Sequence, residues 1–493
     1  MNYRVIFNTL GKVAIALAVM LVVPTILAAC LLEYSWWALL TTVGISLAVG
    51  LGLTFGIKPK NKVIFTKDGL IIVSLAWLYV SAIGALPFVV SRAIPNYIDA
   101  FFEMCSGFST TGATILTGDQ IEAMDKGLLF WRSFSHWIGG MGVIVFLMAF
   151  ESGSSDRGMH VLRAEMPGPI VDKIVPRARD TAKILYLIYI GFTVAEAIAL
   201  IIAGMPIFDS VVHAFGTAGT GGFGIKADSI ASYNAACQWI ITAFMILFGI
   251  NFNLYYLMIL RKFRQVFGSR ELWIFGGVIV VTTTAISIDL ALSNLTFAHT
   301  AHDTVRHAMF QVASFLSTTG YSTIPASYSE GINAFPLLSK GLLFMLMFLG
   351  GMAGSTGGGL KVSRVAILFC AARKELRRVT HPRNANAVKF EGKILSDETL
   401  HGVINYFAIY MLIIAATFVV LSFDGGAGLS VETNITAAVS CINNIGPAYG
   451  AASGGYYMYN WFSKIVMSFV MLLGRLEIYP ILIALTPTTW IKR

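Results

Sequence analysis

Long apolar stretches recur along this chain and divide it into candidate membrane spans. Several of them exceed the roughly 18 apolar residues that a helix needs to cross a bilayer. We predict ten spans, near residues 10–32, 36–56, 69–91, 127–150, 183–204, 236–260, 272–293, 338–370, 402–422 and 463–487. Four further apolar segments are too short to span a bilayer, and these are residues 98–109, 207–219, 303–317 and 431–443.

Each short segment fits a re-entrant half-helix, which enters the membrane and turns back. Such a segment is tolerated at membrane depth only where protein surrounds it. Asp99 and Asp209 suit the N-terminal caps of the first two half-helices. Asp303 and Glu432 stand close to the same position in the other two. The C-terminal end of each half-helix would then direct its negative dipole end inward, where it favours a cation.

A short motif centred on one glycine follows each half-helix. The four motifs read TTGAT at 110–114, TGGFG at 220–224, TTGYS at 318–322 and NIGPA at 444–448. The second matches the K+-channel filter pattern T-x-G-(Y/F)-G, and a ring of four such loops replaces the hydration shell of K+ with backbone carbonyls. Glycine at the centre allows backbone conformations that most side chains forbid. We therefore predict a K+-binding filter made of Thr110, Thr111, Gly112, Thr220, Gly221, Gly222, Thr318, Thr319, Gly320, Asn444, Ile445 and Gly446.

The order span, half-helix, filter loop, span occurs four times. A second marker supports it, because a glycine interrupts each closing span 27 to 31 residues after the filter glycine, at positions 140, 249, 351 and 474. Glycine in a helix interior is destabilising, so glycines at these positions indicate bends or close helix packing. We predict an all-α polytopic membrane protein with four pseudo-repeats around one pore and two additional N-terminal spans. The predicted parts are residues 1–62 (the two N-terminal spans) and 63–182, 183–271, 272–400 and 401–493 (the four pore repeats).

The third and fourth closing spans contain unusual residues. The stretch LGGMAGSTGGGL at 349–360 has six glycines and a Ser-Thr pair, so it should be non-helical backbone that lines a cavity. It is not a phosphate-binding loop, because Leu360 separates its glycines from the lysine and no strand precedes it. The fourth closing span carries Arg475 and Glu477, and charges at membrane depth face a cavity or a partner. Arg475 therefore either lines the ion path or forms an internal salt bridge with Glu477 or another acid.

Composition and charge place the chain in a membrane and orient it. It is 56% hydrophobic and 12% charged, against about 25% charged in soluble domains. With the N-terminus inside, 27 of the 35 Lys and Arg residues fall in cytoplasmic segments or at the cytoplasmic ends of spans, a positive-inside pattern that makes both termini cytoplasmic. The basic excess is therefore a topological signal, and we expect no nucleic-acid partner. No HExxH or GxSxG motif and no pair of in-span carboxylates is found, so we do not expect an enzyme.

With four filter glycines and two spans before the first repeat, the chain resembles the Trk/Ktr/HKT superfamily of K+ transporters. It is most similar to the bacterial TrkH/TrkG-type membrane subunit over essentially its whole length. The resemblance implies K+ uptake across the bacterial cytoplasmic (inner) membrane through a channel-like pore, with K+ at the filter residues and no organic cofactor. It also implies a homodimer in the lipid bilayer and a cytosolic TrkA-like nucleotide-binding regulatory subunit.

The resemblance further implies that the glycine-rich stretch is an intramembrane gating loop below the filter and that Arg475 projects into the ion path. The implied gate residues are Gly350, Gly351, Gly354, Ser355, Thr356, Gly357, Gly358, Gly359 and Arg475. The alternative function is a symporter that couples K+ to H+ or Na+. The residues that could form a proton relay, or could simply hydrogen-bond between helices, are Arg132, His136, Glu196 and His213.

Overall fold

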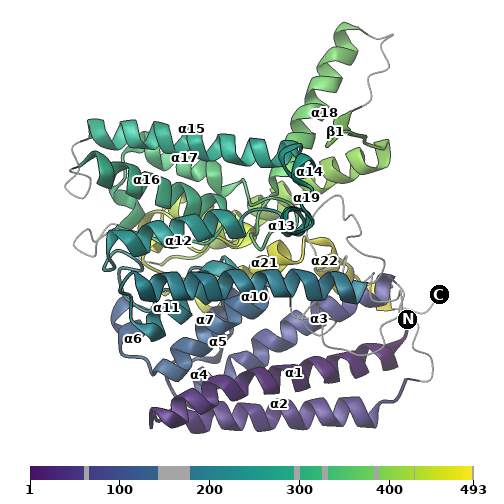
Figure 1. Cartoon of the computed structure of the whole chain (residues 1–493). Helices are drawn as coiled ribbons and strands as arrows, with labels where there is room; N and C mark the ends of the chain where they lie inside the picture. Colours follow the sequence, from purple (N-terminus) through teal and green to yellow (C-terminus); the bar gives the residue numbers. More distant parts are fainter. Residues whose placement is uncertain are drawn as a thin grey trace.

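The computed structural model describes residues 1–59, 66–142, 178–293, 300–324, 331–381, 388–426 and 428–490. Helices make up most of this part of the chain, as Figure 1 shows. The one pair of strands among these residues, β1 (Lys389–Phe390) and β2 (Lys393–Ile394), forms a small antiparallel hairpin. Six described helices are long and apolar enough to cross a membrane, or seven if one bent pair counts as a span. The predicted all-α polytopic membrane fold is confirmed.

Six predicted spans correspond to long helices. They are α1 (Tyr3–Cys30), α2 (Trp36–Gly56), α3 (Thr66–Gly84) with its short continuation α4 (Leu86–Val90), α10 (Ala178–Ile202), α15 (Arg270–Leu292) and α19 (Asp397–Ser422). In Figure 1, the axes of α1, α2, α10 and α15 are nearly parallel or antiparallel to one another. Both chain termini lie at one end of these helices.

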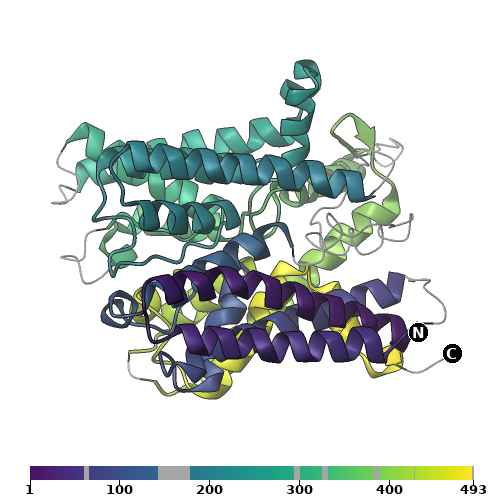
Figure 2. The same ribbon diagram turned by 60° about the horizontal axis from the view of Figure 1, so that its bottom comes forward.

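The two N-terminal helices pack tightly against each other, and Figure 2 shows them side by side at the front. The contact depends on glycine, since a Cβ atom added to Gly11 would lie 2.5 Å from Oγ1 of Thr54, and one added to Gly50 would lie 2.7 Å from Cγ1 of Ile15. Small residues let membrane helices approach this closely. The sequence of α1 and α2 therefore specifies a hairpin of two closely packed helices.

The four short apolar segments are half-helices, as the sequence predicts. They are α5 (Tyr97–Phe108), α11 (Ile207–Gly219), α16 (Ala301–Leu316) and α20 (Val431–Asn443). Their bounds differ from the predicted bounds by two residues at most. Nearly all residues in the C-terminal halves of these helices are buried, which satisfies the condition for a re-entrant segment.

The predicted N-terminal caps were wrong. Asn96 caps α5, and α11 begins after Pro206 without a side-chain cap. Asp99 and Asp209 instead lie in the first turns, where Asp99 accepts a hydrogen bond from Nζ of Lys464 (2.7 Å) and Asp209 accepts one from the Tyr233 hydroxyl (2.8 Å). Carboxylates in the first turn still complement the positive end of the helix dipole. Thr300 and Ser430 cap the other two half-helices.

The three predicted spans at 236–260, 338–370 and 463–487 are each broken into two helices, and the break in the second contains the stretch 349–360 that was predicted to be non-helical. The pieces are α12 (Ala235–Phe248) and α13 (Phe252–Ile259), α17 (Leu337–Met347) and α18 (Val362–Thr380), and α21 (Trp461–Arg475) and α22 (Tyr479–Leu485). The bend between α12 and α13 is 90° and lies at Gly249, whose carbonyl accepts a hydrogen bond from Met352 N (2.9 Å) instead of continuing the helix. The first closing helix, α7 (Lys126–Met141), ends next to Gly142, and residues 143–150 of its predicted span lie outside the described residues.

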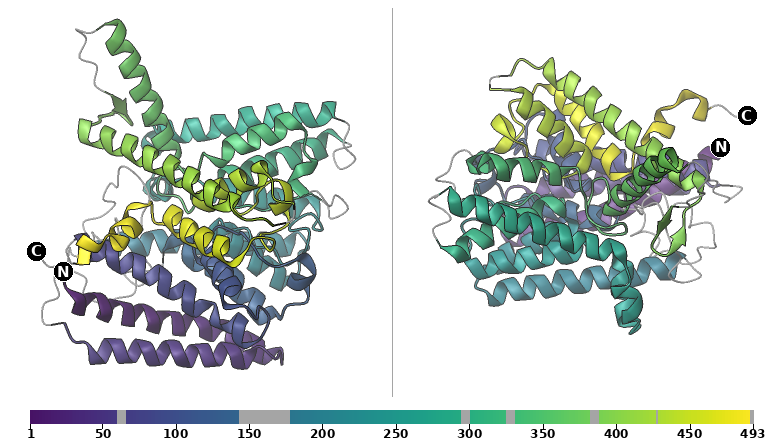
Figure 3. Two further views of the ribbon diagram at one scale, coloured as in Figure 1. Left: turned by 180° about the vertical axis from the view of Figure 1, so that it is seen from behind. Right: turned by 90° about the horizontal axis from the view of Figure 1, so that it is seen from above.

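Helices from the end of the chain pack against helices near its start, because α21 contacts α5 and α22 contacts α3. The Lys464–Asp99 ion pair joins α21 to α5, and the left view of Figure 3 shows the yellow C-terminal helices above the purple N-terminal ones. Near the termini, the Tyr3 hydroxyl donates to the carbonyl of Trp490 (2.6 Å). α18 does not pack within this body along its whole length, because it projects away from the other helices in Figures 1 and 3. The remaining short helices are α6 (Gly118–Glu122), α14 (Phe263–Phe267), α23 (Pro487–Trp490), η2 (Gly331–Ala334) and η3 (Gly450–Ser453).

Candidate functional site

All four half-helices end in the same way. The second residue of each filter motif donates its N–H to the carbonyl five residues earlier, and the first residue is left-handed, which together form a Schellman ending. The hydrogen bonds are Thr111 to Ser106 (2.9 Å), Gly221 to Gly216 (2.8 Å), Thr319 to Ser314 (2.8 Å) and Ile445 to Ser440 (3.1 Å). The left-handed residues are Thr110 (φ 58°), Thr220 (φ 54°), Thr318 (φ 60°) and Asn444 (φ 55°). A β-branched residue rarely adopts this conformation, so three of these endings are strained.

The central glycines are left-handed as well. Their φ angles are 80° (Gly112), 70° (Gly222), 83° (Gly320) and 100° (Gly446), whereas the residue before each glycine is not left-handed. The first and third residues of each motif are therefore left-handed, and the second residue between them is not. This alternation turns successive peptide groups so that their carbonyls face one side, as an ion-coordinating loop requires. The sequence prediction identified the glycines, but it did not anticipate the left-handed threonines.

The four loops form a closed ring in chain order. A Cβ atom added to any filter glycine would clash with a carbonyl oxygen of the next loop, and this oxygen belongs to the second residue of that loop's motif. These distances are 2.0 Å (Gly112 to Gly221), 1.9 Å (Gly222 to Thr319), 2.1 Å (Gly320 to Ile445) and 2.6 Å (Gly446 to Thr111). Because the fourth loop returns to the first, the four loops close a ring.

A cavity of 410 Å³ opens at one end of this ring. All four loops line it, through the filter glycines and the residues that follow them, Ala113, Phe223, Tyr321 and Pro447. The half-helices end at the other end of the ring. The ring therefore separates an open vestibule from the side on which the glycine-rich stretch 349–360 lies.

Two groups tie the ends of the glycine-rich stretch together. Leu349 and Leu360 form a parallel β-bridge, and Gly350 N donates to the Leu360 carbonyl (3.3 Å). Glu271, in the first turn of α15, accepts hydrogen bonds from Ala353 N (2.9 Å) and Ser363 N (3.0 Å) through the same oxygen. Sequence reasoning missed Glu271, which lies 82 residues before Ala353.

The middle of the stretch lies directly against the filter. Gly358 N donates to Oγ1 of Thr318 (2.7 Å), and a Cβ atom added to Gly358 would lie 2.5 Å from the Asn443 carbonyl. The other predicted gate residues surround this contact. Three of them are glycines in close packing contact: Gly351 with Gly249, Gly357 with Ser317, and Gly359 with Gly350. The carbonyl of Gly354 (φ 77°) accepts a hydrogen bond from Phe252 N (3.0 Å). The hydroxyls of Ser355 and Thr356 donate to the carbonyls of Met352 (2.7 Å) and Phe248 (3.2 Å).

Arg475, at the C-terminal end of α21, joins three parts of the site. Its guanidinium donates to the Thr356 carbonyl of the glycine-rich stretch (2.7 Å), to Oγ1 of Thr110 in the first filter loop (3.3 Å), and to the carbonyls of Gly139 and Gly140 in α7 (2.5 Å each). It therefore lies on the side of the ring where the half-helices end and the glycine-rich stretch begins its contact with the loops.

Glu477, by contrast, binds Arg364 of α18 through both carboxylate oxygens (3.2 and 2.5 Å). The salt bridge considered between Arg475 and Glu477 is thus replaced by one from Arg364, which is 113 residues away in sequence. No local sequence pattern could have identified that partner.

Three of the four residues considered for a proton relay have separate partners. His136 Nδ1 lies 2.7 Å from the Gly107 carbonyl, and Arg132 binds Glu103 (2.7 Å). His213 lies between the hydroxyls of Tyr321 (3.3 Å) and Tyr233 (3.4 Å). Neither carboxylate oxygen of the fully buried Glu196 has a hydrogen-bond partner among the described residues. These contacts favour structural roles for the histidines.

Comparison with known proteins agrees with this geometry. Residues 38–489 match the family TrkH, described as a cation transport protein. The chain belongs to the TrkH family. The Trk system potassium uptake proteins TrkH of Salmonella typhimurium (strain LT2) and of Escherichia coli (strain K12) are each 34% identical to it, over 99% of this chain and 100% of theirs. TrkG of Escherichia coli (strain K12) is 32% identical, over 99% of both chains.

The solved structures include a TrkH as well. The crystal structure of the potassium transporter TrkH from Vibrio parahaemolyticus superimposes with a TM-score of 0.87 at 30% identity and covers 100% of both chains. The predicted resemblance to a Trk-type membrane subunit is therefore confirmed. TrkH proteins are transporters, and the expectation that this chain is not an enzyme is confirmed with it.

Proposed function

We propose that this chain takes up K+ across the bacterial cytoplasmic membrane through a channel-like pore that a single chain completes. The observation that carries the proposal is the closed ring. In it, the carbonyl of the second residue of each filter motif lies next to the central glycine of the loop before it. Convergent backbone carbonyls are the ligands that replace the hydration shell of K+. The relatives named as potassium uptake proteins support K+ as the ion.

The gate in this proposal is the glycine-rich stretch 349–360 together with Arg475. An ion leaving the filter on the side of the half-helix ends meets this stretch, because Gly358 bonds to Thr318 of the third filter loop. Arg475 adds a fixed positive charge at the same place and holds the stretch through Thr356. Opening requires the stretch to leave Thr318 and Arg475.

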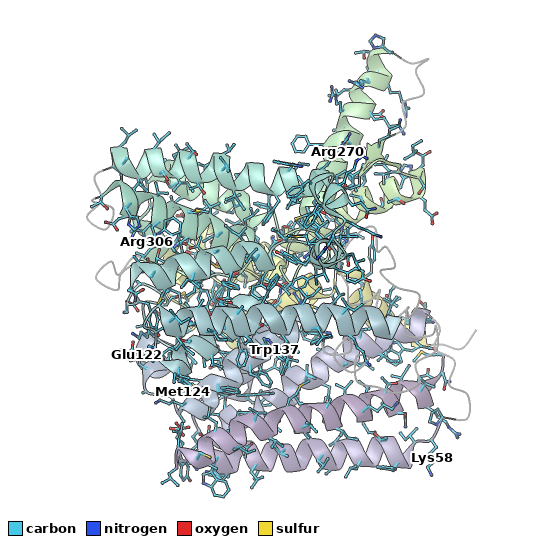
Figure 4. All side chains as sticks on the ribbon, viewed as in Figure 1. Lys58, Glu122, Met124, Trp137, Arg270 and Arg306 are labelled. Carbon is cyan, nitrogen blue, oxygen red and sulfur yellow. The ribbon has the colours of Figure 1, made fainter. Side chains whose placement is uncertain are left out.

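The charge distribution supports an orientation with both termini in the cytoplasm. In Figure 4, Lys58 and Arg270 lie toward the side of the molecule where the chain termini lie, and Glu122 and Arg306 lie on the opposite side. Basic residues collect on the cytoplasmic side of membrane proteins. The vestibule then faces outward and the gate faces the cytosol, which is the direction required for uptake.

Two partners belong to the proposal. A TrkA-like nucleotide-binding subunit would bind the cytosolic segments, of which residues 151–177 lie outside the described residues. The exposed basic residues of α18 available to it are Arg373, Arg377 and Arg378. A homodimer is supported by the apolar face of α18, where Phe369, Leu376 and Val379 are 75%, 70% and 74% exposed. These three side chains share one face of the helix at heptad-like spacing.

A second candidate function is K+ symport with H+. The observation that favours it is Glu196, a fully buried carboxyl in α10 that has no hydrogen-bond partner among the described residues. Ionisable residues at membrane depth are common in proton pathways. The discriminating variant is Glu196→Gln, which abolishes proton-coupled K+ accumulation if the carboxyl carries the proton and leaves passive K+ flux intact.

The proposed function is tested by growth at limiting K+. Expression of this chain in a bacterial strain without its own K+ uptake systems, together with a TrkA-type subunit, should restore growth. Gly222→Ser should not restore growth at equal membrane abundance, because its Cβ atom would lie 1.9 Å from the Thr319 carbonyl. Equal growth with Gly222→Ser, or no growth with the wild type present in the membrane, would contradict the proposal.

A further inference from the structure

We propose that the buried ion pair between Glu103 and Arg132 holds the outer ends of the first two filter loops together and thereby sets the preference for K+ over Na+. Glu103 lies in the half-helix α5 and Arg132 in the closing helix α7. Their exposed fractions are 0% and 1%, and Nε of Arg132 lies 2.7 Å from Oε1 of Glu103. The inference rests on the proposed filter function, and it assigns both side chains a positioning role.

The carboxylate of Glu103 fixes the chain that leaves the first filter loop. It accepts hydrogen bonds from Oγ1 of Thr114 (2.9 Å to Oε1 and 3.1 Å to Oε2) and from Ile115 N (3.0 Å). Thr114 is the last residue of the TTGAT motif. With the bond from Arg132, both oxygens of this carboxylate accept hydrogen bonds, as a buried charge requires.

The guanidinium of Arg132 reaches the second filter loop. Its Nη1 donates to the carbonyl of Gly224 (2.9 Å), and its Cζ lies 3.6 Å from the centre of the Phe223 ring. Both residues belong to the TGGFG motif. Arg132 therefore makes a charge-assisted hydrogen bond and a cation–π contact with one loop while its other side binds the carboxylate that holds the neighbouring loop.

Glu103 lies nine residues before its filter glycine, and each of the other three loops has a different residue at this position. His213 at the corresponding place lies 3.3 Å from the hydroxyl of Tyr321 in the next loop, so it makes a neutral version of the same connection. Gln311 donates to Ser322 in its own loop (3.3 Å), and Ala437 carries no polar group. Among these four positions, the first alone provides a charged connection between neighbouring loops.

The arrangement requires the forked shape of arginine as well as its charge. Nε and Nη1 of one rigid planar group face two different loops, whereas lysine presents a single flexible ammonium. A lysine at 132 could keep the charge next to Glu103 but could not also hold Gly224 and stack on Phe223. The filter carbonyls at the vestibule would then lose a fixed spacing, and spacing and field strength are what discriminate K+ from Na+.

The experiment uses the full-length protein, purified, reconstituted in liposomes and assayed separately for K+ and Na+ uptake per folded molecule. The variants are Arg132→Lys and Glu103→Gln. The matched control is Arg306→Lys, because Arg306 also pairs with an acid on a pore half-helix (2.8 Å to Asp303) but does so at the start of α16, where the two side chains are 13% and 28% exposed. Loss of one charge-assisted hydrogen bond predicts that the K+/Na+ uptake ratio falls about tenfold or more in both variants and stays unchanged in the control.

A merely structural role would lower folded yield and leave the ratio per folded molecule at the wild-type value. A positioning role should raise the half-saturating K+ concentration while the maximal rate stays within about twofold of wild type. A wild-type ratio in folded Arg132→Lys overturns the inference, and if that variant does not fold, a wild-type ratio in Glu103→Gln overturns it. If the wild-type protein itself does not discriminate K+ from Na+, the proposed function fails and the inference fails with it.

Discussion

Replacing Gly112 with serine should reduce the preference for K+ over Na+ more than any change to a helix glycine outside the ring. Real Cβ atoms essentially never approach another heavy atom closer than 3.0 Å, and a Cβ atom at 112 would lie 2.0 Å from the Gly221 carbonyl oxygen. That carbonyl, or the backbone of the first loop, must therefore shift by at least 1.0 Å, the difference between these two distances. The left-handed conformation (φ 80°) adds a penalty of about 1–2 kcal/mol for any residue with a Cβ atom.

The assay is the reversal potential of the purified variant in a bilayer with K+ on one side and Na+ on the other. We expect the K+/Na+ permeability ratio to fall at least about tenfold, equivalent to about 1.4 kcal/mol. Gly446→Ser should have a smaller effect, because its Cβ atom would lie 2.6 Å from the nearest carbonyl oxygen and requires a shift of only 0.4 Å to reach 3.0 Å. Gly191→Ser is the matched control, since nothing lies within 4 Å of an added Cβ atom there. An unchanged ratio in folded Gly112→Ser, or an equal fall in the control, would refute the reasoning.

Three further predictions concern the gate and its regulation. Arg475→Ala should increase K+ flux per folded molecule, because it removes the bond to Thr356 and a positive charge below the filter. Deleting Gly354–Gly359 should increase basal K+ flux in liposomes, because the segment then loses its contact with Thr318. Charge reversal on α18 should weaken co-purification with a nucleotide-binding cytosolic subunit. The residues to reverse are Arg373, Lys374, Arg377 and Arg378.

Each of these predictions has a control. Adding Glu477→Gln to Arg475→Ala should not rescue folded yield, because Glu477 binds Arg364 in this structure, and a rescue with unchanged conductance would exclude a pore role for Arg475. Unchanged basal flux in a well-expressed deletion variant would mean that the loop is not a barrier. Binding of the cytosolic subunit that survives charge reversal would exclude α18 as its docking site.

Local sequence patterns were sufficient to predict the half-helices and the glycine-centred loops that follow them. The apolar segment 207–219 and the helix Ile207–Gly219 have the same bounds, because the filter motif itself ends the helix. Glycine spacing predicted bends or close packing, without saying which occurs where; the structure has a bend at Gly249 and a close contact at Gly474, where an added Cβ atom would lie 1.9 Å from the Ile442 carbonyl. These features depend on nearby residues and on glycine's freedom of conformation.

Features that depend on distant parts of the chain could not be predicted. Thr110 is left-handed although threonine disfavours that conformation, because the ring of loops determines its backbone. Asp99 leaves the cap position to Asn96 and pairs with Lys464, 365 residues later. Glu271 has no local signal at all, since its role appears only when Ala353 folds back onto the start of α15. The domain boundaries at 62, 182, 271 and 400 stay predictions.

The central claim is that one chain forms a passive pore selective for K+, and the direction of ion flow tests it most directly. Purified protein in liposomes with unequal K+ inside and outside should carry current that reverses at the K+ equilibrium potential. This potential should not move when the pH or the Na+ concentration on one side is changed. Reversal midway between the K+ and Na+ equilibrium potentials, or reversal that follows the proton gradient, would contradict the account.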